Sequence, residues 1–135
     1  MPEADVDHIY DYPKGYIEDI LKSVKTIAMV GASGDKTKFS YGVLRVLHET
    51  GYEMLPVNPN PNIKEIRGLK VFRSLKQIDK PVDMVQVFRR KEELLSVAKE
   101  AIEIKAKVLW GQIGVYDDEA AETAKKAGLK VIMNR

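Results

Sequence analysis

The sequence predicts a three-layer α/β fold, in which a mainly parallel five-stranded sheet is covered by helices on both faces. Three observations indicate this class. Short apolar runs of strand length alternate with longer amphipathic segments along the whole chain. Glycine or proline–asparagine turns follow the apolar runs. The chain has 135 residues, 44% hydrophobic and 31% charged, which suits one domain with a single core.

The N-terminal part predicts a tail, a helix and a strand. Residues 1–14 are polar and contain two prolines, so we expect a loose tail. The segment 16–25 places apolar residues at helical spacing and predicts one amphipathic helix. The apolar run 26–30 ends at Gly31, which predicts a buried parallel strand followed by a tight turn.

A second strand–helix unit follows. The segment 40–50 predicts a helix that ends at Gly51, in the manner of a C-terminal glycine cap. Residues 53–57 predict the next strand. Asn58-Pro59-Asn60-Pro61 then predicts a rigid turn, because prolines continue neither a helix nor a central strand.

The second half of the chain repeats the pattern. Between residues 62 and 81 we expect only a short strand at 69–72 and one helical turn at 74–78. The remaining predicted strands are 82–88, 107–110 and 129–133, separated by a helix at 91–106 and a helix that begins at 117–119 and is capped by Gly128.

Five strands alternating with helices predict a Rossmann-type arrangement in a single domain, residues 1–135. In such sheets ligands bind at the carboxyl ends of the strands, near the point where the strand order reverses. The segments that follow the predicted strands are therefore the candidate site: 31–40, 56–61, 88–90, 110–116 and 134–135.

Composition excludes several classes of function. The 22 Lys and Arg nearly balance the 20 Asp and Glu, so there is little general attraction to nucleic acid or to an anionic membrane. The chain has no cysteine, which excludes disulfides, thiolate metal sites and a cysteine nucleophile. No apolar run approaches the roughly 18 residues of a membrane span, and residues 1–7 do not resemble a signal peptide, so we expect a cytoplasmic protein.

The turn after the first strand is suited to phosphate binding. Gly31, Ala32 and Ser33 let a ligand approach the backbone closely, and amides in such a turn attract phosphate oxygens. Lys38 adds a positive charge; a tight turn with solvated lysines is the structural alternative. The turn lacks the Gly-Lys-Ser/Thr ending of a P-loop and the G-x-G-x-x-G spacing of NAD-binding proteins, since Gly34 is the next glycine.

The end of the second strand argues against NAD. NAD-binding domains place a carboxylate there to hold the ribose hydroxyls, whereas this chain has Val57, Asn58 and Pro59. An uncharged, proline-walled pocket favours an adenine nucleotide that does not need that carboxylate.

Two further strand ends leave structural and ligand-binding roles open. Phe88 with Arg89 and Arg90 is suited to a bidentate phosphate contact, or to a solvated charged rim. Trp110, Gln112 and Ile113 lie at and just after the end of the fourth strand. An aromatic residue at a strand end is more often part of the core than of a site, but the two glycines and the glutamine beside it favour a ligand-binding role here. No paired carboxylates, metal-ligand spacing or serine–histidine arrangement is evident, which favours a binding protein over an enzyme.

Together these segments resemble the small CoA-binding-domain proteins, whose fold is similar to the N-terminal CoA-binding domain of the succinyl-CoA synthetase α subunit. The resemblance runs from about residue 25 to the end of the chain. The matching short motifs are, in order, Val30-Gly31-Ala32-Ser33, Gly51-Tyr52, Pro56-Val57-Asn58-Pro59, Gly68, Val82-Asp83, Val87-Phe88-Arg89, Val108-Leu109-Trp110 with Gln112 and Gly114, Glu119-Ala120-Ala121 and Ala127-Gly128-Leu129.

The resemblance implies coenzyme A as the ligand and a role for each strand end. Gly31, Ala32 and Ser33 would hold the diphosphate, with Lys38 beside it. Val57, Asn58 and Pro59 would flank the adenosine. Phe88 and Arg89 would meet the diphosphate or the pantetheine, and Trp110, Gln112 and Ile113 would lie toward the pantetheine arm.

The function expected from these observations is binding of coenzyme A or an acyl-CoA without catalytic machinery, as a carrier, sensor or accessory subunit of an unidentified protein partner. Two alternatives stay open. The first is an NAD(P)-binding oxidoreductase or redox-responsive subunit. The second is an interaction module that keeps the fold without a ligand.

Overall fold

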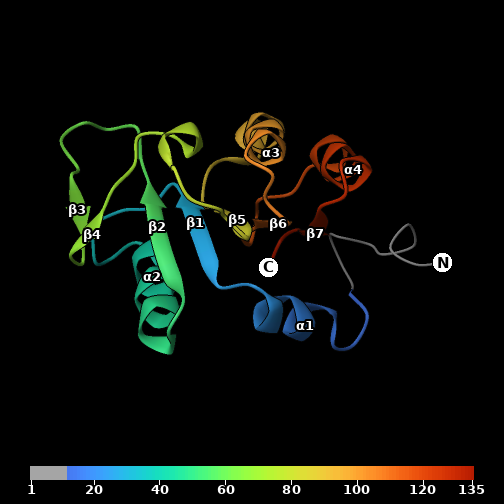
Figure 1. Cartoon of the computed structure of the whole chain (residues 1–135), viewed down its shortest axis with the longest axis horizontal. Coiled ribbons are helices and arrows are strands. Elements are labelled where there is room, and N and C mark those ends of the chain that lie inside the picture. The colour runs from blue at the N-terminus through green and yellow to red at the C-terminus, as the bar shows by residue number, and fades with distance from the viewer. Residues whose placement is uncertain (1–11) are drawn as a thin grey trace.

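The fold class predicted from the sequence is confirmed. The structure is a computed structural model and describes residues 12–135. Its main sheet has five parallel strands in the order β2-β1-β5-β6-β7 (Figure 1). The strands are β1 (Thr26–Val30), β2 (Glu53–Val57), β5 (Met84–Val87), β6 (Val108–Gly111) and β7 (Lys130–Ile132).

Helices cover both faces of the sheet and make it the middle of three layers. α1 (Tyr16–Ser23) and α2 (Phe39–Thr50) lie on one face, and α3 (Leu94–Glu103) and α4 (Asp118–Lys126) lie on the other (Figure 1). The strands are buried on both sides. Within β1, for example, Ile27 packs toward α1 and α2 while its neighbour Ala28 packs toward α3 and α4.

Capping residues end α2 and begin α4 where the sequence predicts. Gly51 closes α2 with φ of 116°, in the left-handed region that glycine adopts without strain. Asp117 precedes α4, and its carboxylate accepts a 2.9 Å hydrogen bond from the backbone N–H of Ala120. The predicted helix 91–106 is shorter and divided, with a 3-10 turn at Lys91–Glu93 before α3.

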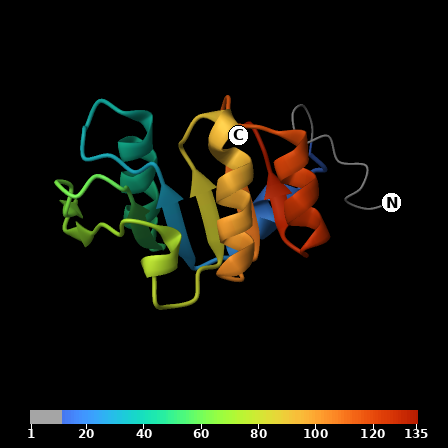
Figure 2. The ribbon, with the colours of Figure 1, turned by 90° about the horizontal axis from the view of Figure 1, so that it is seen from above.

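A small hairpin lies beside the outer edge of β2 (Figure 2). Its strands are β3 (Glu65–Ile66) and β4 (Leu69–Lys70), and a 3-10 turn at Leu75–Gln77 follows. The predicted strand 69–72 is thus shorter than expected, although Phe72 continues to pair with Val57 of β2. β3 was not predicted, because two residues carry too little periodicity to detect.

The end of the predicted tail is packed on the sheet. Residues 1–11 lie outside the described residues, but Tyr12 stacks on Tyr16 with ring centroids 5.4 Å apart. The Tyr16 hydroxyl accepts from the N–H of Val131 at 3.3 Å and donates to its carbonyl at 3.0 Å. The Tyr12 hydroxyl makes the same two contacts with Met133. The prediction of a loose tail is therefore wrong at Tyr12.

Strand order positions the functional end of the sheet. β1 lies between β2 and β5, so the chain leaves β1 toward one edge of the sheet and later returns to its other side. The carboxyl ends of β1 and β5 flank this switch point, where doubly wound sheets bind ligands. None of the helices in residues 12–135 has the length and apolar character needed to cross a membrane.

Candidate ligand-binding site

A cleft of about 540 Å³ opens at the carboxyl ends of β1, β2 and β5, at the switch point of the sheet. We call it the main cleft. Its lining comes from the turn after β1, the start of α2 and the segments that follow β2 and β5. The lining residues are Gly31, Ala32, Ser33, Lys38, Phe39, Ser40, Asn58, Phe88, Arg89, Arg90 and Glu93.

The glycine turn is fixed against the neighbouring strands. Gly31 has φ of 92°, and a Cβ atom there would lie 2.5 Å from the carbonyl oxygen of Phe88. The N–H groups of Gly31 and Ala32 both donate to the carbonyl of Val57, at 3.0 and 3.3 Å. These two amides are therefore engaged within the fold, and the turn binds phosphate through other donors or not at all.

Four other backbone N–H groups remain available at the main cleft. Those of Ser33 and Gly34 in the turn, and of Phe39 and Ser40 at the start of α2, donate to no acceptor within residues 12–135. The N-cap residue Lys38 also provides no side-chain cap for this helix. Because the N-terminus of a helix carries partial positive charge, these amides form a donor set suited to an anion.

The turn between Ser33 and Lys38 is ordered by its own side chains. The Ser33 hydroxyl oxygen accepts from the N–H of Asp35 at 3.0 Å. The Asp35 carboxylate accepts from the N–H and hydroxyl of Thr37 at 2.9 and 2.7 Å, and these bonds lower the pKa of Asp35. Since the Ser33 oxygen only accepts here, its hydroxyl hydrogen is free to donate to a ligand.

The loop after β2 is tied to the glycine turn and to itself. The side-chain amide of Asn58 donates to the carbonyl of Ala32 at 2.8 Å, and its oxygen accepts from the N–H of Asn60 at 2.9 Å. The Arg73 guanidinium donates to the carbonyls of Asn58, Pro61 and Ile63 at 3.2, 3.1 and 2.9 Å. Arg73 thus organises the loop that presents Asn58, a role that no sequence signal indicated.

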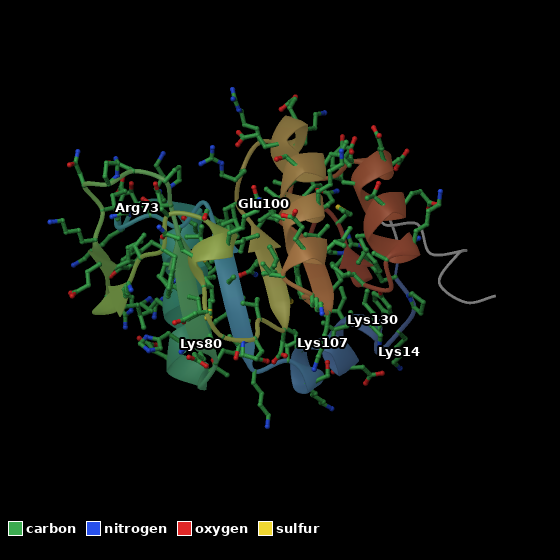
Figure 3. All side chains as sticks on the ribbon, turned by 45° about the horizontal axis from the view of Figure 1, so that its top comes forward. Lys14, Arg73, Lys80, Glu100, Lys107 and Lys130 are labelled. Atoms are coloured by element: carbon green, nitrogen blue, oxygen red, sulfur yellow. The ribbon has the colours of Figure 1, made fainter. Side chains whose placement is uncertain are left out.

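A second cleft of about 350 Å³ lies on the α3 side of the same strand ends. It is lined by Val30, Val57, Pro59, Arg73, Ser74, Leu75, Arg89, Glu92, Glu93, Ser96, Val97 and Glu100. Figure 3 labels Arg73, on the loop before the 3-10 turn, and Glu100, on α3. The second cleft has an apolar floor and several carboxylates at its rim.

Arg89 and Glu93 line both clefts and form an ion pair at their boundary. Oε1 of Glu93 accepts from Nε and Nη2 of Arg89 at 2.9 and 2.7 Å. Oε2 accepts from Nε of Arg90 at 3.3 Å. The pKa of Glu93 is lowered mainly by the Arg89 guanidinium and to a smaller extent by that of Arg90. The Glu93 carboxylate is therefore ionised at neutral pH.

The structure brings most of the predicted site residues together, but not all. Gly31, Ala32, Ser33, Lys38, Asn58, Phe88 and Arg89 line the main cleft, and Val57 and Pro59 line the second cleft. The three predicted residues within and just after β6 line neither one. Trp110 is buried against the α1 and α2 face, Gln112 is buried, and Ile113 is 71% exposed.

Sequence reasoning placed Phe39 and Ser40 in the candidate segment 31–40 but gave neither residue a role, and it missed Glu93 as a lining residue of the main cleft. The Phe39 ring is 58% exposed and meets Phe88 edge-to-face at 6.2 Å, and Ser40 is buried beside it. A signal for the first two existed, because residues that open the helix after a glycine turn face the same ligand as the turn. Glu93 had no such signal, since an i,i+4 pair with Arg89 is common on helical surfaces.

Comparisons with known proteins identify the family of the chain. The family described as "CoA binding domain" matches residues 25–135. The uncharacterised protein YneT of Bacillus subtilis is 44% identical over 90% of this chain and 88% of its own length. The structure of a hypothetical protein from Pyrococcus horikoshii superposes with a TM-score of 0.88, at 33% identity over 97% of this chain and 91% of that one.

A larger enzyme subunit also matches. The α subunit of the ADP-forming acetate–CoA ligase I of Pyrococcus furiosus is 29% identical over 84% of this chain but only 28% of its own length. The chain therefore spans little more than a quarter of that subunit. With the family match covering nearly all described residues, the chain belongs to the CoA-binding-domain family.

Proposed function

We propose that this protein binds coenzyme A or an acyl-CoA, with the ligand diphosphate in the main cleft. The observation that carries the proposal is the set of free amides at Ser33, Gly34, Phe39 and Ser40, which lie beside the cationic side chain of Lys38. A diphosphate supplies several acceptor oxygens and negative charge, and both match this donor set. Membership of the CoA-binding-domain family supports the choice of ligand.

The two clefts suggest how the rest of the ligand lies. Val57 and Pro59 line the second cleft together with the apolar side chains of Leu75 and Val97, which suits a planar adenine ring. The exposed Phe39 ring and the half-buried Phe88 ring lie on the α2 side of the main cleft and suit the pantetheine arm. The diphosphate, which joins adenosine to pantetheine, then lies between them.

The arrangement at β2 favours coenzyme A over NAD. The residue that follows β2 is Asn58, whose side chain is engaged with Ala32 and Asn60. The carboxylate of β2 itself, Glu53, lies at the opposite end of the strand, where it pairs with Lys80 at 2.6 Å. Figure 3 shows Lys80 at the end of the sheet away from Arg73. Within residues 12–135, no acidic side chain therefore occupies the position directly after β2 that holds the adenine ribose in NAD-binding domains.

The physiological role that we propose is carrying, sensing or presenting the bound cofactor, as an accessory subunit of a partner protein. The ligase α subunit supports it, since a similar domain occurs there within a much longer chain.

The ligand is tested by thermal stabilisation. A ligand that prefers the native state raises the melting temperature according to its concentration and affinity. We expect coenzyme A to raise it more than NAD, NADP or ATP at equal concentration, and native mass spectrometry of freshly purified protein to show a co-purified CoA mass. An equal or larger shift with NAD would overturn the choice of cofactor.

The placement of the diphosphate is tested by Ser33→Asp. The new carboxylate would repel a diphosphate a few ångströms away by about 1–4 kcal/mol for effective dielectric constants of 80 to 20. Ser23→Asp is the matched control, because Ser23 is exposed at the end of α1 and lines neither cleft. Calorimetry showing unchanged CoA affinity in a folded Ser33→Asp protein would move the diphosphate to another site.

A further inference from the structure

The Glu93 carboxylate lies where a bound anion would be expected. It is the one acidic residue among the described residues that line the main cleft, and it is shared by two arginines. Arg89 and Arg90 together direct three N–H groups at its two oxygens. A phosphate bound between the same guanidinium groups would use the same donors.

The ion pair also lies on the path between the two clefts. Both Arg89 and Glu93 line the main and the second cleft. The stem of Arg89 crosses the glycine turn, because a Cβ atom at Gly31 would lie 3.0 Å from Cδ of Arg89. A ligand that occupies both clefts therefore passes over this pair.

Structural stability does not account for the contact. The side chains of Arg89 and Glu93 are 34% and 31% exposed, and that of Arg90 is 82% exposed. Ion pairs with this exposure contribute little to folding, since water and salt screen them. An ionised carboxylate beside a diphosphate is repelled by it, so the two anions compete for the arginine donors.

We propose that Glu93 is an internal counter-ion, which holds Arg89 and Arg90 at the cleft boundary and gives way to the ligand diphosphate. The inference rests on the proposed function, because it requires a ligand that carries a diphosphate. Substitution of Glu93 should therefore change the affinity in the opposite direction to substitution of a residue that contacts the ligand favourably. Removing the Glu93 carboxylate strengthens binding, because the ligand no longer has to separate an existing ion pair.

The test compares Glu93→Gln with the wild-type protein by calorimetry, using coenzyme A, inorganic pyrophosphate and pantetheine. Glu103→Gln is the matched control: Glu103 lies on α3, pairs with Lys76 at 3.3 Å and lines neither cleft. We expect Glu93→Gln to bind coenzyme A and pyrophosphate about fivefold more tightly, from the repulsion of like charges about 4 Å apart in water. Pantetheine, which has no phosphate, should bind both proteins equally.

The outcomes separate this inference from the proposed function. If the wild-type protein binds coenzyme A and Glu93→Gln binds it equally or more weakly, the counter-ion role is wrong and the function stands. If Glu103→Gln gains the same affinity for coenzyme A, the counter-ion role is also wrong, because the loss of any one negative charge from the protein then explains the tighter binding. If the wild-type protein binds no coenzyme A, the proposed function fails. Melting temperatures and circular dichroism of all variants verify that each one is folded.

Discussion

The side-chain amide of Asn58 donates a 2.8 Å hydrogen bond to the carbonyl oxygen of Ala32, 26 residues earlier in the chain. This bond joins the loop after β2 to the glycine turn after β1. The Arg73 guanidinium holds the same loop through three carbonyl groups. The two loops that line the main cleft are thus ordered by side chains before any ligand arrives, which lowers the entropic cost of binding.

Asn58→Ala is expected to weaken coenzyme A binding about fivefold, because the glycine turn loses its link to the β2 loop. The free energy of unfolding should fall by about 1–2 kcal/mol, because the substitution removes both the partly buried hydrogen bond to Ala32 and the exposed one from the N–H of Asn60. Asn62→Ala is the control, since the Asn62 side chain makes no hydrogen bond in residues 12–135. Calorimetry and urea denaturation measure both effects; equal losses in the two variants would contradict the role of Asn58.

Gly31→Ala is expected to destabilise the fold by more than about 2 kcal/mol. The added Cβ would lie 2.5 Å from the Phe88 carbonyl oxygen, and Gly31 already has φ of 92°. Gly34→Ala should change the free energy of unfolding by less than about 1 kcal/mol, because the nearest atom to its Cβ lies 3.9 Å away. Denaturant titration of both variants tests the difference, and a mild effect at Gly31 would contradict the close approach.

Asp83 is expected to make the free energy of unfolding depend on pH in the acidic range. Burial raises its pKa, but the N–H groups of Lys25 and Thr26, at 2.8 and 3.2 Å, and the nearby Lys107 ammonium outweigh that effect and hold it below 3.8. A depressed pKa stabilises the fold above about pH 4, and this stability is lost as pH falls through the folded-state pKa.

The measurement for Asp83 is urea denaturation of wild type and Asp83→Asn between pH 3 and pH 7. The variant should lose about 1–3 kcal/mol at pH 7, and the difference should shrink toward pH 3. Asp79→Asn, an exposed neighbour, serves as control. A difference that stays constant with pH would show that ionised Asp83 is not the cause.

The protein alone is expected not to turn over acetyl-CoA or succinyl-CoA. Acyl transfer needs a positioned nucleophile with a base, and the lining of the main cleft contains serine hydroxyls without histidine. Binding without such groups positions a ligand but does not lower a chemical barrier. Thioester hydrolysis assays decide the point: steady turnover that Ser33→Asp abolishes would identify an enzyme.

The arrangement of the strands could be predicted because each one is a short apolar run. The runs 26–30 and 53–57 coincide with β1 and β2, and parallel strands necessarily bring their carboxyl ends to one edge of the sheet. Position along the chain was therefore enough to bring three of the five candidate segments, 31–40, 56–61 and 88–90, to the main cleft.

The direction of individual side chains was harder to predict. Val57, Asn58 and Pro59 were expected at one site, yet Asn58 lines the main cleft and the other two line the second cleft. Successive residues at a strand end point to opposite faces, so three in a row do not share one cleft. The same reasoning applies to Trp110, whose position in β6 turns it into the core on the α1 and α2 face.

The hydroxyl groups of Tyr12 and Tyr16 cover one edge of the main sheet, at β7. β7 is an edge strand, and exposed edges invite strand addition from another chain. Tyr16 and Tyr12 occupy the N–H and carbonyl groups of Val131 and Met133, alternate residues of the kind that a sixth strand would pair with. Replacing both phenols by phenylalanine would leave these backbone groups without their phenol partners, so the double variant should self-associate through β7 more strongly than the wild-type protein.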